Sequence, residues 1–394
     1  MGGLPFGVGY HEQFDFDAFQ TAAVKQAAPL YKKIKTFLSV HQIQVIHVEM
    51  VLGHILCPPL TFALRKLIEQ DGVVAISRSY DFPWDSTTLH RQALHQVLRY
   101  FPVVHPHVLH LTQTKFGLEG IQKWCPEVVS RSIPNFFPFT INEADYRGQE
   151  FRESLGVKPQ DLLLLQPSRV EFKKGPHHSI HLAGQLKHRT GQSVTVAITG
   201  KTYPIWGEYK TILNEIAQAY DIKLVFLEGA PIHQFGDPNG QNTAAFSITD
   251  AFLGADIITI ASLNEGFGNT NIEAVAAKRL LFANEYKVMT HEFLPHGFDF
   301  ILMQDPFTDI QKIAQILTEP DRDWVYQALR RTYNFDDSPI PVRAIDRVVD
   351  LLQNPQKRQA VIEANWHIGA KVYNKDQLGA YLEPIKAWIE NQLN

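Results

Sequence analysis

Short apolar runs alternate with stretches of helical periodicity along most of the chain. In the second half, five such runs are apolar at nearly every position: residues 162–167, 194–199, 222–227, 257–260 and 280–283. Strands that are apolar at every position are typical of parallel sheets that helices cover on both faces. The alternation therefore predicts a doubly wound α/β domain, which binds its ligand at the carboxyl ends of the strands.

The first half shows the same alternation less regularly. Its periodicity predicts a helix over 19–40 and strands over 45–51, 73–77, 108–112 and 128–133. Residues 1–20 contain Gly-Gly and Gly-x-Gly, but no strand precedes them. The strand and glycine loop that usually open a nucleotide-binding domain are therefore expected to be absent or replaced.

Two domains are expected, because 394 residues exceed the length of one ordinary core. Two prolines followed by polar residues indicate a linker over 138–152. The first Rossmann-like domain is predicted over 1–140 and the second over 141–374.

The most informative stretch begins at the apolar run 257–260. A polar turn with two glycines follows this run, and then a capping signal ahead of a helix. A helix N-terminus entered through glycines offers unpaired N–H groups and a partial positive charge, which suits a phosphate. Glu265 and Glu273 flank this turn, and their carboxylates are more plausible as acceptors for sugar hydroxyls than as phosphate ligands. A lone glutamate would more simply complement the helix dipole, but the pair favours a sugar nucleotide.

Composition narrows the function classes. An apolar content of 45% and a charged content of 20% are those of a soluble globular protein, and the net charge of −4 argues against nucleic acid as a partner. The two cysteines, Cys57 and Cys125, are too few for a disulfide framework, and this favours the reducing cytoplasm as the location of the protein. No run is long enough for a bilayer span and no signal peptide opens the chain, so no transmembrane segment is expected.

The stretch from Glu265 to Glu273 resembles the glutamate-x7-glutamate motif, with its EGFG core, of the family-four retaining glycosyltransferases. The resemblance implies the α/β GT-B fold, in which two Rossmann-like domains with parallel sheets face each other across a cleft. It also implies a helix within 375–394 that crosses back to the first domain. In that family the first glutamate contacts the donor sugar and the second the ribose. The backbone that meets the diphosphate corresponds here to Gly266, Phe267, Gly268, Asn269 and Thr270.

A second segment, residues 168–175, resembles the G-R-L…K-G motif of the same family. Arg169 and Lys174 are therefore implied as ligands of the donor phosphates, the first as a bidentate donor and the second as a point charge. The family's turn near the nucleobase corresponds to the segment around Gly229, which is a further donor-binding candidate.

The segment after the strand at 73–77 resembles the family's His-Asp-Phe sequence, with Tyr80 in place of the histidine. That histidine lies close to the anomeric carbon of the donor, so Tyr80 is a catalytic candidate, although a tyrosine cannot be cationic near neutral pH. Aromatic packing at the domain edge is an equally good interpretation of Tyr80. His54, Asp81 and Asp85 are candidates for acceptor binding.

The resemblance implies a retaining transfer of a hexose from a nucleotide-diphosphate sugar to a hydroxyl group of a small-molecule or glycan acceptor. No cofactor and no metal are expected, because protein cations and the helix N-terminus meet the developing charge. Two alternatives stay open: a non-catalytic relative that binds a nucleotide or sugar, and a phosphorylase on the same architecture. An oxidoreductase is disfavoured, because no Gly-x-Gly-x-x-Gly follows a strand.

Overall fold

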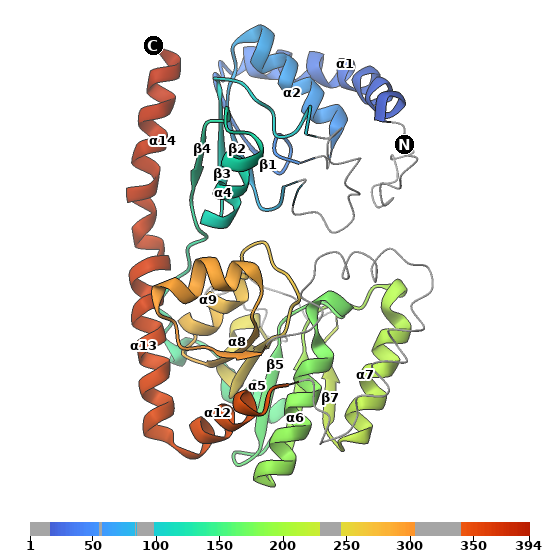
Figure 1. Ribbon diagram of the computed structural model, residues 1–394, viewed down its shortest axis with the longest axis vertical. Coiled ribbons are helices and arrows are strands. Elements are labelled where there is room, and N and C mark those ends of the chain that lie inside the picture. The colour runs from blue at the N-terminus through green and yellow to red at the C-terminus, as the bar shows by residue number, and fades with distance from the viewer. Residues whose placement is uncertain (1–15, 55–56, 83, 85–97, 229–245, 304–339) are drawn as a thin grey trace. The chain divides into compact units, whose positions relative to one another are not determined.

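A computed structural model of the chain describes residues 16–54, 57–82, 84, 98–228, 246–303 and 340–394. These residues form two compact units (Figure 1). The first consists of the described residues up to Asn135 together with Leu378–Asn394, and the second of those within Phe136–Gln377. None of the described helices is both long and apolar enough to cross a membrane.

The first unit is built on a four-stranded parallel sheet of order β1-β2-β3-β4. Its strands are β1 (Val45–Glu49), β2 (Val74–Ser79), β3 (Val108–Thr112) and β4 (Ser130–Ser132). Its helices are α1 (Phe16–Val40), α2 (Pro58–Asp71), α4 (Lys115–Trp124) and α14 (Leu378–Leu393). Because all four strands run the same way, their carboxyl ends lie along one edge of the sheet.

The second unit has a six-stranded parallel sheet of order β10-β9-β8-β5-β6-β7. Its strands are β5 (Leu162–Gln166), β6 (Val194–Ile198), β7 (Lys223–Phe226), β8 (Ile257–Ile260), β9 (Leu280–Asn284) and β10 (Ile301–Met303). The chain adds strands outward from β5, returns to the other side of β5 with β8, and continues outward. The order therefore reverses between β5 and β8, where an open α/β sheet binds its ligand.

Helices cover both faces of this sheet. They are α5 (Gly148–Ser154), α6 (Pro176–Thr190), α7 (Gly207–Ala219), α8 (Ile248–Gly254), α9 (Asn269–Ala276), α12 (Val342–Gln353) and α13 (Pro355–Tyr373). Short turns of helix are η2 (Glu143–Asp145), η3 (Phe172–Lys174), η4 (Pro204–Trp206), η6 (Met289–Phe293), η7 (Leu294–His296) and η9 (Lys375–Gln377).

The apolar strands explain the two helical layers. Leu162 and Leu164 of β5 pack into one core with residues of α6, α7 and α12. Leu163 and Leu165 are as fully buried, and successive side chains of a strand point to opposite faces, so they face the other layer. There α8 contacts β5, and α9 contacts β8 and β9.

The alternation read from the sequence is confirmed by these two sheets, with differences at element ends. Helix α1 begins at Phe16, and β4 is limited to Ser130–Ser132. The expectation of a linker over 138–152 was wrong in part, because α5 begins at Gly148 and packs on α8. A Cβ on Gly148 would lie 2.8 Å from Leu253 Cβ, so this close packing requires glycine.

Candidate active site

Two loops leave the sheet of the second unit at its switch point, one after β5 and one after β8. They are joined by a backbone hydrogen bond of 2.9 Å, in which Leu263 N donates to Lys173 O. Gly175 closes the first loop at φ +63°, and a Cβ there would lie 2.2 Å from Ala261 O of the second. Only glycine satisfies both the backbone angle and this approach. The segments that the sequence analysis singled out separately are thus held side by side.

The central contact of these loops is an ion pair between two predicted site residues. Lys174 Nζ donates a hydrogen bond of 2.6 Å to Glu265 Oε1. The two side chains are only 15% and 18% exposed, so solvent screens the pair weakly. A cation and a carboxylate therefore stand together at the carboxyl ends of β5 and β8.

A buried polar network beneath the loop fixes the backbone of Lys174. Gln166 Nε2 donates to Lys174 O at 3.1 Å and to Ser168 Oγ at 2.8 Å. The Ser179 hydroxyl lies 2.7 Å from Gln166 Oε1 and 2.8 Å from Thr259 Oγ1. Sequence reasoning missed Gln166, Ser179 and Thr259 as positioning residues. The available signal was a single polar residue within each of two otherwise apolar strands.

Arg169 lies on the same loop but does not join the ion pair. Its Nη2 is 3.0 Å from Glu171 Oε1, and its guanidinium lies 5.7 Å from the centre of the Tyr203 ring. The side chain is 49% exposed. A Cβ on Gly200 would lie 2.5 Å from Arg169 Cα, so glycine there lets the loops after β5 and β6 touch. A role for Arg169 in donor binding stays a prediction.

Helix α9 starts directly after the glycine turn. Gly268 is its N-cap residue at φ +91°, so no N-cap side chain covers the N–H groups of the first turn. A Cβ on Gly268 would lie 2.3 Å from the Tyr286 hydroxyl oxygen, which accepts a hydrogen bond of 2.6 Å from Asn271 Nδ2. This helix start has the geometry that accepts an anion.

The side chain of Phe267 anchors the turn instead of facing a ligand. It is buried and lies against the rings of Phe293 and Tyr373, with ring centres 5.3 and 5.8 Å away. At Phe267, therefore, the backbone and not the side chain is left to meet a donor.

Glu273 is half-buried on α9. Removal from water raises the pKa of its carboxyl group to about 7, although a hydrogen bond with the Thr270 side chain acts in the opposite direction. Glu273 therefore changes charge near neutral pH, whereas an ordinary glutamate is fully ionised there.

Two predicted site residues, Gly229 and Asp85, lie outside the described residues. Glu228, just before Gly229, is held by two donors at its Oε1, Thr202 Oγ1 at 2.5 Å and Lys210 Nζ at 2.7 Å. These contacts lower the pKa of Glu228 and keep it ionised.

The candidates of the first unit lie at the carboxyl edge of its sheet. Tyr80 follows β2 and is 38% exposed, and burial together with a hydrogen bond to Glu49 raises the pKa of its hydroxyl. His54 is close enough to Asp81 for that carboxylate to raise its pKa, but burial outweighs this effect and lowers the pKa overall. Both Tyr80 and His54 are therefore neutral at pH 7, and their roles stay predictions.

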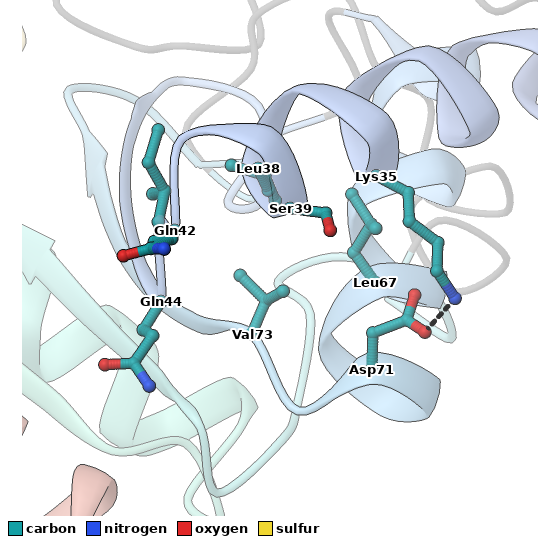
Figure 2. Close-up of a pocket in the computed structure, with 9 residues that line it drawn as sticks. Lys35, Leu38, Ser39, Gln42, Gln44, Leu67, Asp71 and Val73 are labelled. Carbon is teal, nitrogen blue, oxygen red and sulfur yellow. Dashed lines mark hydrogen bonds and ion pairs between the residues drawn. The ribbon is translucent and has the colours of Figure 1, made fainter.

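A pocket of about 520 Å³ lies at the other edge of this sheet. Figure 2 shows Lys35 of α1 and Asp71 of α2 on one side of it, joined by an ion pair of 2.5 Å. Gln44 and Val73, which directly precede β1 and β2, also line it. The pocket therefore opens at the amino ends of the strands, away from the candidate residues.

Comparison with known proteins bears on the segment that holds the ion pair. The family model of the group 1 glycosyl transferases matches residues 148–320. Mannosylglucosylglycerate synthase of Petrotoga mobilis is 23% identical over 317 residues, which are 74% of this chain and 70% of that protein.

Two solved structures resemble the chain over most of its length. HepE of Anabaena, in complex with UDP and glucose, has a TM-score of 0.58 at 15% identity. The match covers 92% of this chain and 83% of the HepE chain. Sucrose-phosphate synthase of Thermosynechococcus elongatus has a TM-score of 0.57 at 13% identity, with 91% of this chain and 77% of that chain covered. The chain has a GT-B fold. The fold class predicted from the sequence is confirmed, and the family match and the curated relative support glycosyltransferase activity.

Proposed function

We propose that this protein is a retaining glycosyltransferase that transfers a hexose from a nucleotide-diphosphate sugar to a hydroxyl group of a small-molecule or glycan acceptor. The observation that carries the proposal is the ion pair of Lys174 and Glu265 at the switch point, just ahead of the uncapped start of α9. Both residues lie within the segment that matches the group 1 glycosyl transferases.

The ion pair suggests how a donor is received. An arriving diphosphate replaces Glu265 as the partner of Lys174, and Arg169 and the first N–H groups of α9 supply further donors. Glu265 is then released to accept a hydrogen bond from a hydroxyl of the donor sugar. Glu273 accepts one from the ribose.

The reaction proceeds on one face of the sugar. The bond from the anomeric carbon to the diphosphate breaks while the acceptor oxygen attacks from the same side, and the acceptor proton passes to the departing diphosphate. The negative charge grows in front of Lys174, Arg169 and the helix start. Each hydrogen-bond donor that is fixed in place before the reaction in this way lowers the activation free energy by about 3–4 kcal/mol. Because these groups meet the charge, we propose that the reaction needs no divalent metal and no cofactor.

The test is thermal unfolding with a panel of nucleoside diphosphates and their hexose derivatives. UDP belongs in the panel because HepE binds it. A ligand at about 100 times its dissociation constant stabilises a protein by about 2.7 kcal/mol, so one nucleotide series should raise the Tm clearly. Lys174→Ala should abolish the shift and Lys173→Ala should keep it. No shift with any nucleotide or nucleotide sugar would overturn the proposal. A shift without transfer or donor hydrolysis would favour a non-catalytic relative, and turnover that requires inorganic phosphate would point to a phosphorylase.

The raised pKa of Glu273 predicts that donor binding depends on pH. A carboxylate accepts a ribose hydroxyl more strongly than a neutral acid does, and Glu273 loses its proton as the pH rises through about 7. Affinity for the nucleotide sugar is therefore expected to weaken by about tenfold from pH 8 to pH 6. Titration calorimetry at several pH values measures this change. Glu273→Gln should bind weakly at every pH, and an unchanged wild-type affinity across this range would exclude the role.

A further inference from the structure

Arg78 of β2 is a cation that lies outside both motifs of the second unit, the stretch from Glu265 to Glu273 and residues 168–175. It lies one residue before the carboxyl end of its strand, at the edge where Tyr80 and Asp81 follow. Its Nη2 donates a hydrogen bond of 2.6 Å to Asn135 Oδ1, and its guanidinium lies 5.7 Å from the centre of the Tyr80 ring. The guanidinium is thus held in place by a neutral amide and an aromatic ring.

A row of amides extends from Arg78 across the ends of three strands. Asn135, which follows β4, donates from Nδ2 to Gln113 Oε1 at 2.9 Å. Gln113, which follows β3, lies with its Nε2 3.5 Å from Tyr80 O. Side chains from separate strand ends therefore fix one another, and the guanidinium has little freedom to turn away.

The charge of Arg78 is not balanced within the part of the chain that the structure describes. There, no carboxylate forms an ion pair with it, and its Nε is buried without a hydrogen-bond acceptor. The acid opposite it in the sheet register is Glu49. Glu49 instead lies 3.3 Å from His47 Nε2 and accepts a hydrogen bond from the Tyr80 hydroxyl. A half-buried guanidinium with unused donors is a receptor for an anion.

We propose that Arg78 binds an anionic group, a carboxylate or a phosphate, on the acceptor substrate. The inference rests on the proposed function and specifies its acceptor as an acid that also carries the attacking hydroxyl. The planar guanidinium would pair with the anion, and the amides of Asn135 and Gln113 would hold the neighbouring hydroxyls. A neutral sugar would leave the charge of Arg78 without a partner, so the site discriminates against it.

The test compares three probes that differ only at one carbon: glucose, glucuronate and glucose 6-phosphate. Binding is measured by titration calorimetry on the full chain. Wild type is expected to bind at least one of the two anions about tenfold or more tightly than glucose, and the better anion identifies the group. Arg78→Met should remove this preference, and Arg78→Lys should keep only part of it because lysine lacks the planar fork. Arg65→Met is the matched control, because Arg65 is paired with Glu69 on α2.

The outcomes separate this inference from the proposed function. Arg78→Met should show the same Tm shift with the nucleotide donor as wild type, because Arg78 lies in the first unit. Equal binding of all three probes, or a preference that survives in Arg78→Met, would overturn the inference while leaving donor binding intact. If Arg78→Met fails to fold, Arg78→Lys decides, since a preference identical to that of wild type would contradict a fork-shaped receptor.

Discussion

Replacing Lys174 with methionine is expected to lower kcat for sugar transfer by about 10²–10³-fold, which is the typical cost of removing one fixed donor from a developing negative charge. Methionine keeps most of the side-chain volume and removes the charge. The measurement is steady-state transfer with the donor that the nucleotide panel identifies. Lys173→Met is the matched control, because the neighbouring lysine contributes its backbone to the loop contact and its side chain is outside the ion pair.

Combining Lys174→Met with a change at Glu265 distinguishes the contribution of the ion pair to stability from its contribution to sugar transfer. Without Lys174, the half-buried carboxylate of Glu265 loses its partner, so the protein should lose about 1–3 kcal/mol of stability. Adding Glu265→Gln removes the stranded charge, and the double variant should recover stability without recovering transfer. Chemical denaturation measures the first effect and kinetics the second. If the double variant regained activity together with stability, the ion pair would be structural and the assignment of both residues to the site would fail.

Residues that are close in sequence could be assigned to elements before the structure was known. The run at 257–260 and the capping signal after it correspond to β8 and the start of α9, and the helix predicted within 375–394 is α14. Each of these signals is local, because the apolar pattern of a buried strand and the cap of a helix are determined by residues that are adjacent in the sequence.

The contacts that build the site could not be predicted in the same way. Lys174 and Glu265 are 91 residues apart, and only the reversal of strand order between β5 and β8 brings them within hydrogen-bonding distance. Arg78 was overlooked for a related reason. In the sequence it is one charged residue in a strand. That its partner is a neutral amide, with no carboxylate paired to it among the described residues, becomes visible only when β3 and β4 place Gln113 and Asn135 beside it.

Gly268→Ala is expected to weaken nucleotide binding by at least about tenfold, because one added methyl group disturbs the start of α9. Alanine rarely adopts φ +91°, which costs of order 1–3 kcal/mol. Its Cβ would also lie 2.3 Å from the Tyr286 hydroxyl oxygen and 2.6 Å from Asn271 Nδ2. Either strain moves the N–H groups that we propose to hold the diphosphate. Calorimetric titration with the identified nucleotide gives the affinity, and thermal unfolding gives the stability.

A matched control and a rescue variant sharpen this experiment. Gly207 follows η4 at φ −58°, and a Cβ there would have no neighbour within 4 Å, so Gly207→Ala should bind nucleotide normally. Adding Tyr286→Phe to Gly268→Ala removes the nearest clashing atom but leaves the backbone strain, so affinity should return in part. Wild-type affinity in Gly268→Ala alone would mean that the diphosphate does not depend on the start of α9. The anion site would then have to rest on Lys174 and Arg169 without the helix.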